Sequence, residues 1–230
     1  MGLALVALAL TSGSPPPVHP AAARIIHLGG VRVSLRQATR QVITVNGTRR
    51  THARITLWQL RDGHWRALIG SRAARTGYGG LVAGTRRHQG TGTTPLGTYP
   101  LLFTFGTGAA ETGSAMRYTQ VGPEDYWVED NTSPYYNRYR SKAAGGFRYW
   151  LNPRSVNGSE RLAAYPGQYR LAVVIGYNYS HPVRYRGAGI FLHVNGPGAT
   201  AGCVSTPLAF LQHAVADLDP AQHPVIAIGS

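Results

Sequence analysis

The sequence predicts a mainly β protein. Of its 230 residues, 29 are glycine and 15 are proline, which favours many turns between short elements. The apolar residues occur mostly in short runs, and a hydrophobic fraction of 43% is enough for a buried core. Only one segment, near the C-terminus, has the spacing of an amphipathic helix. We therefore expect mixed sheets with one or few short helices.

The first 23 residues differ from the rest of the chain. Leu3–Leu10 is an apolar run, followed by a Ser- and Pro-rich stretch up to Pro20. The run is too short for a membrane-spanning helix, which needs about 20 residues. It has the size of a signal-peptide core, with Ala21–Ala23 as a candidate cleavage site, although no Lys or Arg precedes Arg24. We expect residues 1–23 to be a signal peptide and linker, and residues 24–230 to form one domain without an integral membrane span.

Strand-like runs separated by turn signals begin at Gln41. Asn-Gly and Asp-Gly between alternating apolar and polar residues are strong hairpin signals. We expect an antiparallel meander with one buried face, made of three strands and two turns in this order: Gln41–Val45, Asn46-Gly47, Ala53–Leu60, Asp62-Gly63 and Trp65–Gly70.

The second half of the chain supplies the remaining elements. Thr93–Leu101 has the composition of a turn followed by a strand, and Tyr169–Tyr177 is the clearest buried strand. Ile190–Leu192 predicts another buried strand, with His193 at or near its end. Thr206–Leu218 predicts the helix, with Thr206 as N-cap and Pro207 at the first helical position, and Pro224–Ile228 predicts a terminal strand.

The segment from Tyr118 to Tyr139 allows two interpretations. It is dense in aromatic residues and carries four of the chain's nine carboxylates, namely Glu124, Asp125, Glu129 and Asp130. Aromatic and acidic side chains together in a loop-rich region suit the wall of a ligand site. Tyrosine and tryptophan also fill ordinary protein cores, so both interpretations stay open.

The charge is strongly positive, with a formal net charge of +14. Such a charge attracts polyanions, which include nucleic acids, anionic membranes and acidic cell-envelope polymers. The arginines occur singly or in pairs such as Arg49-Arg50 and Arg86-Arg87, and no nucleic-acid-binding motif is present. We therefore do not expect a nucleic-acid partner.

The single cysteine excludes an intramolecular disulfide and makes a thiolate zinc site improbable. The histidines form no metal-binding pattern, and the chain lacks phosphate-binding loops and the Gly-x-Ser-x-Gly elbow of serine hydrolases. Paired glycosidase carboxylates between Glu124 and Asp130 cannot be assigned from sequence. We expect neither a metal nor a cofactor.

The stretch from His193 to Ser205 is the strongest candidate for a catalytic site. A glycine-containing loop follows His193 and leads to Cys203, the only cysteine. Such a loop can bring the thiol back towards the imidazole, and a nearby imidazole or backbone N–H groups can activate a thiol as a nucleophile. The alternative is a small buried cysteine beside a structural histidine.

Two segments together resemble a known family. Thr93–Tyr99 resembles the TPxGxY strand entry of L,D-transpeptidase catalytic domains of the YkuD type, and His193–Ser205 resembles that family's closing signature. The pairs Tyr136-Asn137 and Tyr177-Asn178 also look like those of its peptidoglycan-active members. The resemblance covers roughly residues 40–230.

The resemblance implies a YkuD-like β-sandwich and an exported enzyme that acts on peptidoglycan stem peptides. We expect the protein to be a monomer. Cys203 would be the nucleophile and His193 the general base. Gly202 would support the oxyanion hole through its backbone N–H together with that of Cys203, and Thr200 would occupy the family's Ser/Thr position. Anionic cell-wall polymers would match the basic charge. We expect five residues to face the substrate: Tyr136, Asn137, Tyr177, Asn178 and Asn195. The alternative for the first four is that they are ordinary turn and core residues.

The chain departs from the commonest family form in two ways. Ala201 replaces the usual histidine before Gly-Cys, and the spacing between His193 and Cys203 is shorter, as in a divergent branch of the family. Asn195 or a backbone carbonyl could therefore orient His193. The acyl acceptor stays open among cross-linking, hydrolysis and protein anchoring. An inactive wall-binding module and a basic nucleic-acid-binding protein are the alternative functions.

Overall fold

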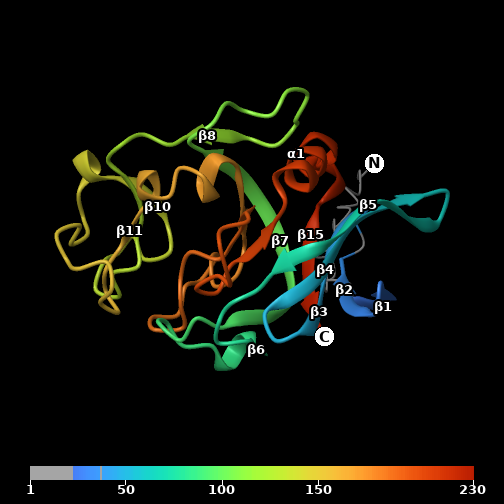
Figure 1. Ribbon diagram of the computed structural model, residues 1–230, viewed down its shortest axis with the longest axis horizontal. Helices are drawn as coiled ribbons and strands as arrows, with labels where there is room; N and C mark the ends of the chain where they lie inside the picture. Colours follow the sequence, from blue (N-terminus) through green and yellow to red (C-terminus); the bar gives the residue numbers. More distant parts are fainter. Residues whose placement is uncertain (1–22, 37) are drawn as a thin grey trace, which may run out of the picture.

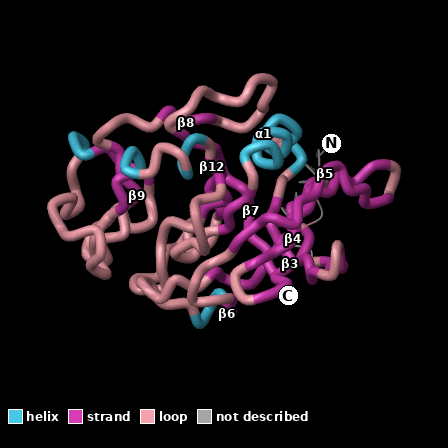
Figure 2. The backbone as a smooth tube through the Cα atoms, in the orientation of Figure 1, coloured by secondary structure: helices cyan, strands magenta, loops and turns pink. Residues whose placement is uncertain are grey.

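The elements follow the short apolar runs of the sequence. A computed structural model describes residues 23–36 and 38–230, so the expected signal peptide and linker lie outside the described residues except for Ala23. Figures 1 and 2 show the chain. Its first strands are β1 Arg24–Leu28, β2 Val31–Leu35, β3 Gln41–Arg49, β4 His52–Arg61, β5 His64–Arg75, β6 Leu81–Ala83 and β7 Thr94–Gly106.

The later elements are shorter. The strands are β8 Tyr118–Gln120, β9 Asp125–Trp127, β10 Tyr139–Ser141, β11 Glu160–Arg161, β12 Ala172–Ile175, β13 Phe191–Val194, β14 Val204–Thr206 and β15 Val225–Gly229. The α-helix among the described residues is α1 Leu208–Asp217. Short 3₁₀ turns are η1 Gly84–Arg86, η2 Lys142–Ala144, η3 Leu162–Ala164, η4 Gln168–Arg170 and η5 Pro220–Gln222.

Eight strands close into a barrel. Their order is β12-β13-β14-β5-β4-β3-β15-β7, and β7 pairs in turn with β12. The pairs β13–β14 and β3–β15 are parallel and the other neighbours are antiparallel. The mainly β class and the mixed sheets are thus confirmed. The structure does not confirm the two packed sheets of a sandwich, because the β7–β12 pairing closes the sheet on itself.

The meander is confirmed, but its first turn is not at the predicted position. Strand β4 alternates buried and more exposed residues, which gives it one core face. Asp62 and Gly63 form the second turn with positive φ values of 49° and 77°, as Asp-Gly hairpins require. The first turn is not at Asn46-Gly47. Those residues continue β3, because Asn46 pairs with Arg54 and its side chain donates a hydrogen bond to the Gly29 carbonyl.

The helix begins later than expected. Thr206 belongs to β14, where it pairs with Val194, and Pro207 is the N-cap of α1. The predicted strand Tyr169–Tyr177 is likewise shorter, because Tyr169 lies in η4 and only Ala172–Ile175 pairs in the sheet. No described helix has the length and apolarity that a membrane crossing requires.

The barrel carries a loop-rich layer on one outer face. Inside, Ile43, Ile55, Leu57, Leu192 and Val204 pack with the buried side of α1. On the outer face of β7, β12 and β13, a second apolar cluster joins the barrel to residues of the long loops: Phe103, Phe105, Trp127, Tyr136, Leu162, Tyr169, Val174, Phe191 and Cys203. Figures 1 and 2 show these loops, with β9, β10 and β11, extending to one side of the strands.

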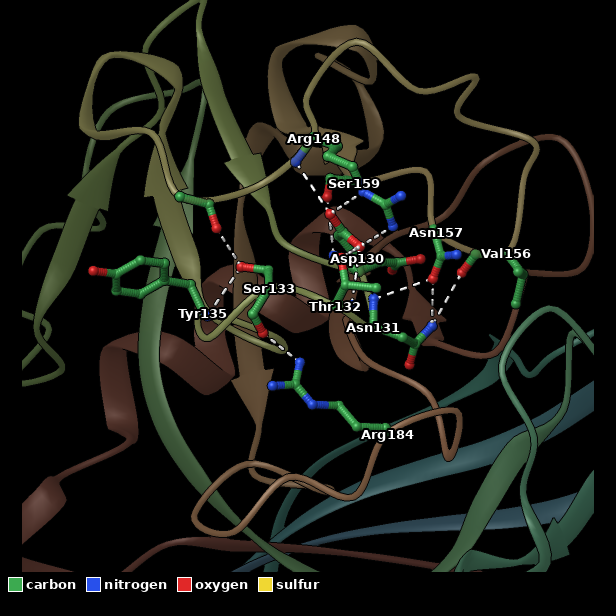
Figure 3. Close-up of polar contacts among 12 residues, drawn as sticks. Asp130, Asn131, Thr132, Ser133, Tyr135, Arg148, Val156, Asn157, Ser159 and Arg184 are labelled. Atoms are coloured by element: carbon green, nitrogen blue, oxygen red, sulfur yellow. Dashed lines mark hydrogen bonds and ion pairs between the residues drawn. The ribbon is translucent and has the colours of Figure 1, made fainter.

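A buried carboxylate organises the loop-rich layer. Asp130 is 1% exposed and forms an ion pair with Arg148 at 2.6 Å. The carboxylate also accepts hydrogen bonds from the Thr132 hydroxyl and backbone N–H (Figure 3). The Arg148 bond, followed by the Thr132 bonds, outweighs burial and holds the pKa of Asp130 well below its usual range.

We predict that Asp130→Asn lowers the free energy of unfolding by about 1.5–3 kcal/mol, the range for hydrogen bonds to charged groups. The depressed pKa means that the carboxylate stabilises the fold at neutral pH, and that this contribution fades as the pH falls below the ordinary Asp value of about 3.9. Urea unfolding at pH 7 and pH 3 measures both effects.

The matched control is Glu124→Gln. The Glu124 side chain is 47% exposed and pairs with Lys142 at 2.7 Å, so its loss should cost less than about 1 kcal/mol. Equal destabilisation by the two variants would contradict the role given to Asp130.

Candidate active site

The register of two strands places the candidate catalytic side chains. β13 and β14 run parallel, with Leu192 opposite Val204 and His193 opposite Ser205. Successive side chains of a strand point to opposite faces. Leu192 and Val204 accordingly lie in the barrel core, whereas Phe191 and Cys203 belong to the outer cluster. His193 shares the face of Phe191, so the imidazole and the thiol are diagonal neighbours on one surface.

Both side chains border the same cavity, which has a volume of about 1050 Å³. The loop after β13 contributes Thr200 and Ala201 to its lining, and the loop-rich layer contributes a wall of acidic, aromatic and polar residues. The lining includes Arg87, Glu129, Glu160, Tyr169 and Gly189. From the Tyr118–Tyr139 segment, Tyr126 and Glu129 line this cavity, whereas Trp127 and Tyr136 are core residues.

Cys203 borders this cavity, and the residue is 8% exposed. Its sulfur accepts a hydrogen bond from the Phe191 N–H and donates one to the Gly189 carbonyl, both at 3.3 Å. Burial, followed by the nearby Glu160, raises the pKa of the thiol to about 12, against the smaller opposing effects of the Phe191 N–H and Arg87. The thiol is therefore protonated at neutral pH.

The His193 imidazole is neutral and has a defined tautomer. It is 3% exposed, and burial lowers its pKa to about 4. Its Nδ1 lies 2.8 Å from the Val194 carbonyl oxygen. A carbonyl only accepts hydrogen bonds, so Nδ1 carries the proton and Nε2 keeps a free lone pair. The backbone carbonyl, rather than Asn195, orients the ring, and Tyr169 packs edge-on against it at 5.5 Å between centroids.

No hydrogen bond joins His193 to the Cys203 thiol among the described residues, whose sulfur contacts are those to Phe191 and Gly189. The imidazole can act as a base only after the thiol and the ring move into hydrogen-bond contact. Catalytic hydrogen bonds are often long in the unliganded state of enzymes, so this arrangement is compatible with a dyad.

The two sequence segments that resemble the L,D-transpeptidase family meet at the Cys203 carbonyl. This oxygen accepts hydrogen bonds from the Thr200 hydroxyl at 2.6 Å and from the Thr94 hydroxyl at 3.3 Å. The Thr94 hydroxyl in turn accepts from the Gly77 N–H at 2.8 Å. The backbone of the candidate nucleophile is thus fixed by residues from both segments.

Gly202 has a structural role that the sequence did not indicate. Its φ is +135°, and a Cβ there would lie 2.9 Å from the Thr93 carbonyl oxygen. Its N–H donates a hydrogen bond to the Thr200 hydroxyl at 3.2 Å. This N–H thus has a partner within the loop, and the oxyanion role of Gly202 stays a prediction.

The five residues expected to face the substrate do not line the cavity that holds Cys203. Tyr136 is 1% exposed, and its hydroxyl donates to the Gln89 side chain at 2.6 Å. Tyr177 and Asn178 border a separate cavity of about 640 Å³. The Asn195 side chain donates to the Ala73 carbonyl and accepts from the Ser205 hydroxyl.

Asn137 acts as a positioning residue. It is 2% exposed with a positive φ of 60°. Its side-chain oxygen accepts from the Trp127 ring N–H and from the Gly189 N–H, at 2.8 Å and 3.0 Å. Because the Gly189 carbonyl accepts the Cys203 thiol hydrogen, Asn137 helps to position the candidate nucleophile through Gly189.

Three ionisable residues complete the site. The sequence did not single out Arg87 or Glu160 as candidate site residues. Arg87 is 4% exposed and lines the cavity. Glu160 accepts the Tyr169 hydroxyl at 2.8 Å, and burial raises its pKa to about 7. Burial and the neighbouring Glu160 raise the pKa of Glu129 to about 8. In the sequence, the signals for these residues were the Arg86-Arg87 pair and the carboxylate-rich segment that contains Glu129.

Comparisons with family models, curated proteins and solved structures returned no match for this chain. No group of three or more His, Cys, Asp or Glu side chains suited to a metal ion occurs in the part of the chain that the structure describes. The chemistry of the site therefore has to be argued from its own residues.

We predict that iodoacetamide alkylates Cys203 slowly at pH 8, about 100-fold or more below the rate for a free cysteine derivative, because burial keeps the thiol protonated. The rate should continue to rise above pH 9. Cys203 is the only cysteine, so the mass shift of the intact protein reports it alone. The urea-unfolded protein serves as the control, and a folded-state midpoint near pH 8.5 would show a solvated thiol instead.

We also predict that Thr94→Val lowers the free energy of unfolding by about 1–3 kcal/mol, since the buried Gly77 N–H and the Cys203 carbonyl lose a partner with little change in shape. Denaturant unfolding measures the loss. Thr93→Val is the control, because the Thr93 hydroxyl contacts only the exposed Thr91 hydroxyl. If Thr93→Val is as harmful as Thr94→Val, the contact between the two segments is not the cause.

Proposed function

We propose that this chain is an exported peptidoglycan L,D-transpeptidase with a YkuD-type catalytic domain. The observation that carries the proposal is that Cys203 and His193, from neighbouring segments, lie on the same face of the sheet and border one cavity. The contact of Thr94 with the Cys203 carbonyl supports it, because it ties the two resembling segments together. The substrate would be a stem peptide of the cell wall.

In this proposal His193 Nε2 takes the thiol proton as the sulfur attacks a peptide carbonyl carbon. The C–N bond then breaks, the imidazolium returns its proton to the leaving amine, and a thioester forms on Cys203. An amine of a second stem peptide, or water, attacks this thioester and regenerates the thiol. The Cys203 N–H would support the oxyanion, together with the Gly202 N–H once that group leaves the Thr200 hydroxyl.

The composition supports a location in the cell envelope. A net charge of +14 suits a monomer that works beside wall carboxylates and anionic wall polymers. The short apolar run at residues 3–10 has the size expected for an export signal. Nucleic-acid binding, the other use of such a charge, rests on the charge alone.

A catalytically inactive wall-binding module is the second candidate. It is favoured by the buried, protonated thiol and by the lack of a hydrogen bond between His193 and Cys203 among the described residues. The cavity would then hold a stem peptide without reacting. The two functions differ in one measurable product, the thioester on Cys203.

We predict that incubation with a disaccharide-tetrapeptide adds an acyl mass to Cys203, seen by intact mass spectrometry. Cys203→Ala should abolish the adduct, and His193→Ala should slow its formation about 100-fold or more through loss of the general base. His213→Ala is the matched control, because His213 lies on the exposed side of α1 beside Asp217.

If folded wild type, like Cys203→Ala, forms no acyl adduct while both still bind the wall, the protein is a binding module and not an enzyme. Equal slowing by His193→Ala and His213→Ala would remove His193 from the mechanism.

A further inference from the structure

The cavity around Cys203 contains a guanidinium and two carboxyl groups that form no ion pair with each other. Arg87, Glu129 and Glu160 all border it. The ion pairs among the described residues include none of the three. Charged groups taken out of water need a partner of opposite charge, so a cavity with separated charges is complementary to a ligand that carries both signs.

Arg87 lines the cavity, and carbonyl groups bind only part of its guanidinium. Its Nε donates to the Thr93 carbonyl at 2.7 Å and its Nη1 to the Arg186 carbonyl at 3.1 Å. Its Nη2 makes no hydrogen bond with the described residues, and a Cβ on Gly202 would lie only 2.8 Å from it. The guanidinium is thus buried, held by two carbonyls, and left with a donor beside the Gly202-Cys203 backbone.

The Glu129 carboxyl lies beside Gly189, the residue whose carbonyl binds the thiol. A Cβ on Gly189 would lie 2.7 Å from Glu129 Oε1, and the Gly189 carbonyl accepts the thiol at 3.3 Å. The Glu129 carboxyl accepts no hydrogen bond from the described residues, and both Glu129 and Glu160 are half-buried. Glycine at 189 leaves open the space in front of the Glu129 oxygen.

We propose that this cavity binds an α-amino-acid group with a free ammonium and a free carboxylate. The carboxylate would bind the Arg87 Nη2, and the ammonium would lie against Glu129 and Glu160. This deepens the proposed function, on which it rests for placing the group within a stem peptide. The ligand class itself follows from the charges alone.

The protonation of the carboxyls supports this assignment. Their pKa values are raised, to about 8 for Glu129 and about 7 for Glu160, chiefly because burial removes water from the charged forms. A bound ammonium would supply the missing favourable contact and lower both values.

The test uses D-alanine, its amide and N-acetyl-D-alanine as probes of the full chain. The amide keeps only the ammonium and the acetyl derivative only the carboxylate. Binding is followed by NMR titration and by protection of Cys203 from iodoacetamide. D-alanine should bind about tenfold or more tightly than either derivative, since each derivative loses one charge-assisted contact.

Variants assign each charge. Glu129→Gln and Glu160→Gln should remove the advantage of D-alanine over N-acetyl-D-alanine, and Arg87→Gln should remove its advantage over the amide. Arg86→Gln and Glu124→Gln, both at exposed positions, are the matched controls and should change neither ratio. If Arg87→Gln fails to fold because Thr93 and Arg186 lose their contacts, the two Glu variants still decide the ammonium half.

The inference is overturned if D-alanine does not protect Cys203, if its derivatives bind equally well, or if both Glu variants leave its affinity unchanged. Acylation of Cys203 by a tetrapeptide without D-alanine binding would remove this inference and leave the proposed function. Binding of D-alanine to wild type and Cys203→Ala without any acylation would support this inference and remove the proposed function.

Discussion

The parallel pairing of β13 with β14 is the constraint on which the candidate site depends. Leu192 and Val204 are opposite one another and fill the barrel, which leaves His193 and Cys203 on the cavity side. A shift of one residue would exchange the two sets of side chains. That shift would expose Leu192 and bury the imidazole among aliphatic groups. Apolar packing inside the barrel therefore fixes the geometry of polar groups outside it.

Around this pair the cavity opposes ionisation of the thiol. Burial and the Glu160 carboxyl raise its pKa, and Arg87 acts in the opposite direction with a smaller effect. The imidazole is neutral for the same reason of burial. A thiol in this state is protected from adventitious oxidation, which requires the thiolate. A cation beside the carboxyls would oppose only the carboxyl part of this shift, because burial is the larger cause of the raised pKa.

The sequence predicted what depends on local pattern and missed what depends on distant partners. Alternation revealed β4, and Asp62-Gly63 forms the expected turn because its two positive φ values suit a tight hairpin. Asn46-Gly47 carries the same signal, but the Asn46 side chain binds the Gly29 carbonyl and the strand continues. Barrel closure depends on β7 pairing with β12, segments about 70 residues apart, for which no local signal exists.

The candidate site divides in the same way. Cys203 was identified as the only cysteine, and His193 because a glycine-containing loop joins it to Cys203. Arg87 and Glu160 resemble any surface charge until the fold brings them to the same cavity. Asn137 was expected to touch the ligand, yet it binds the Gly189 N–H while the Gly189 carbonyl receives the thiol. A chain of contacts one layer removed from the cavity thus controls the position of the sulfur. Residues that look like ligand contacts in a sequence can equally be the ones that hold the reactive group in place.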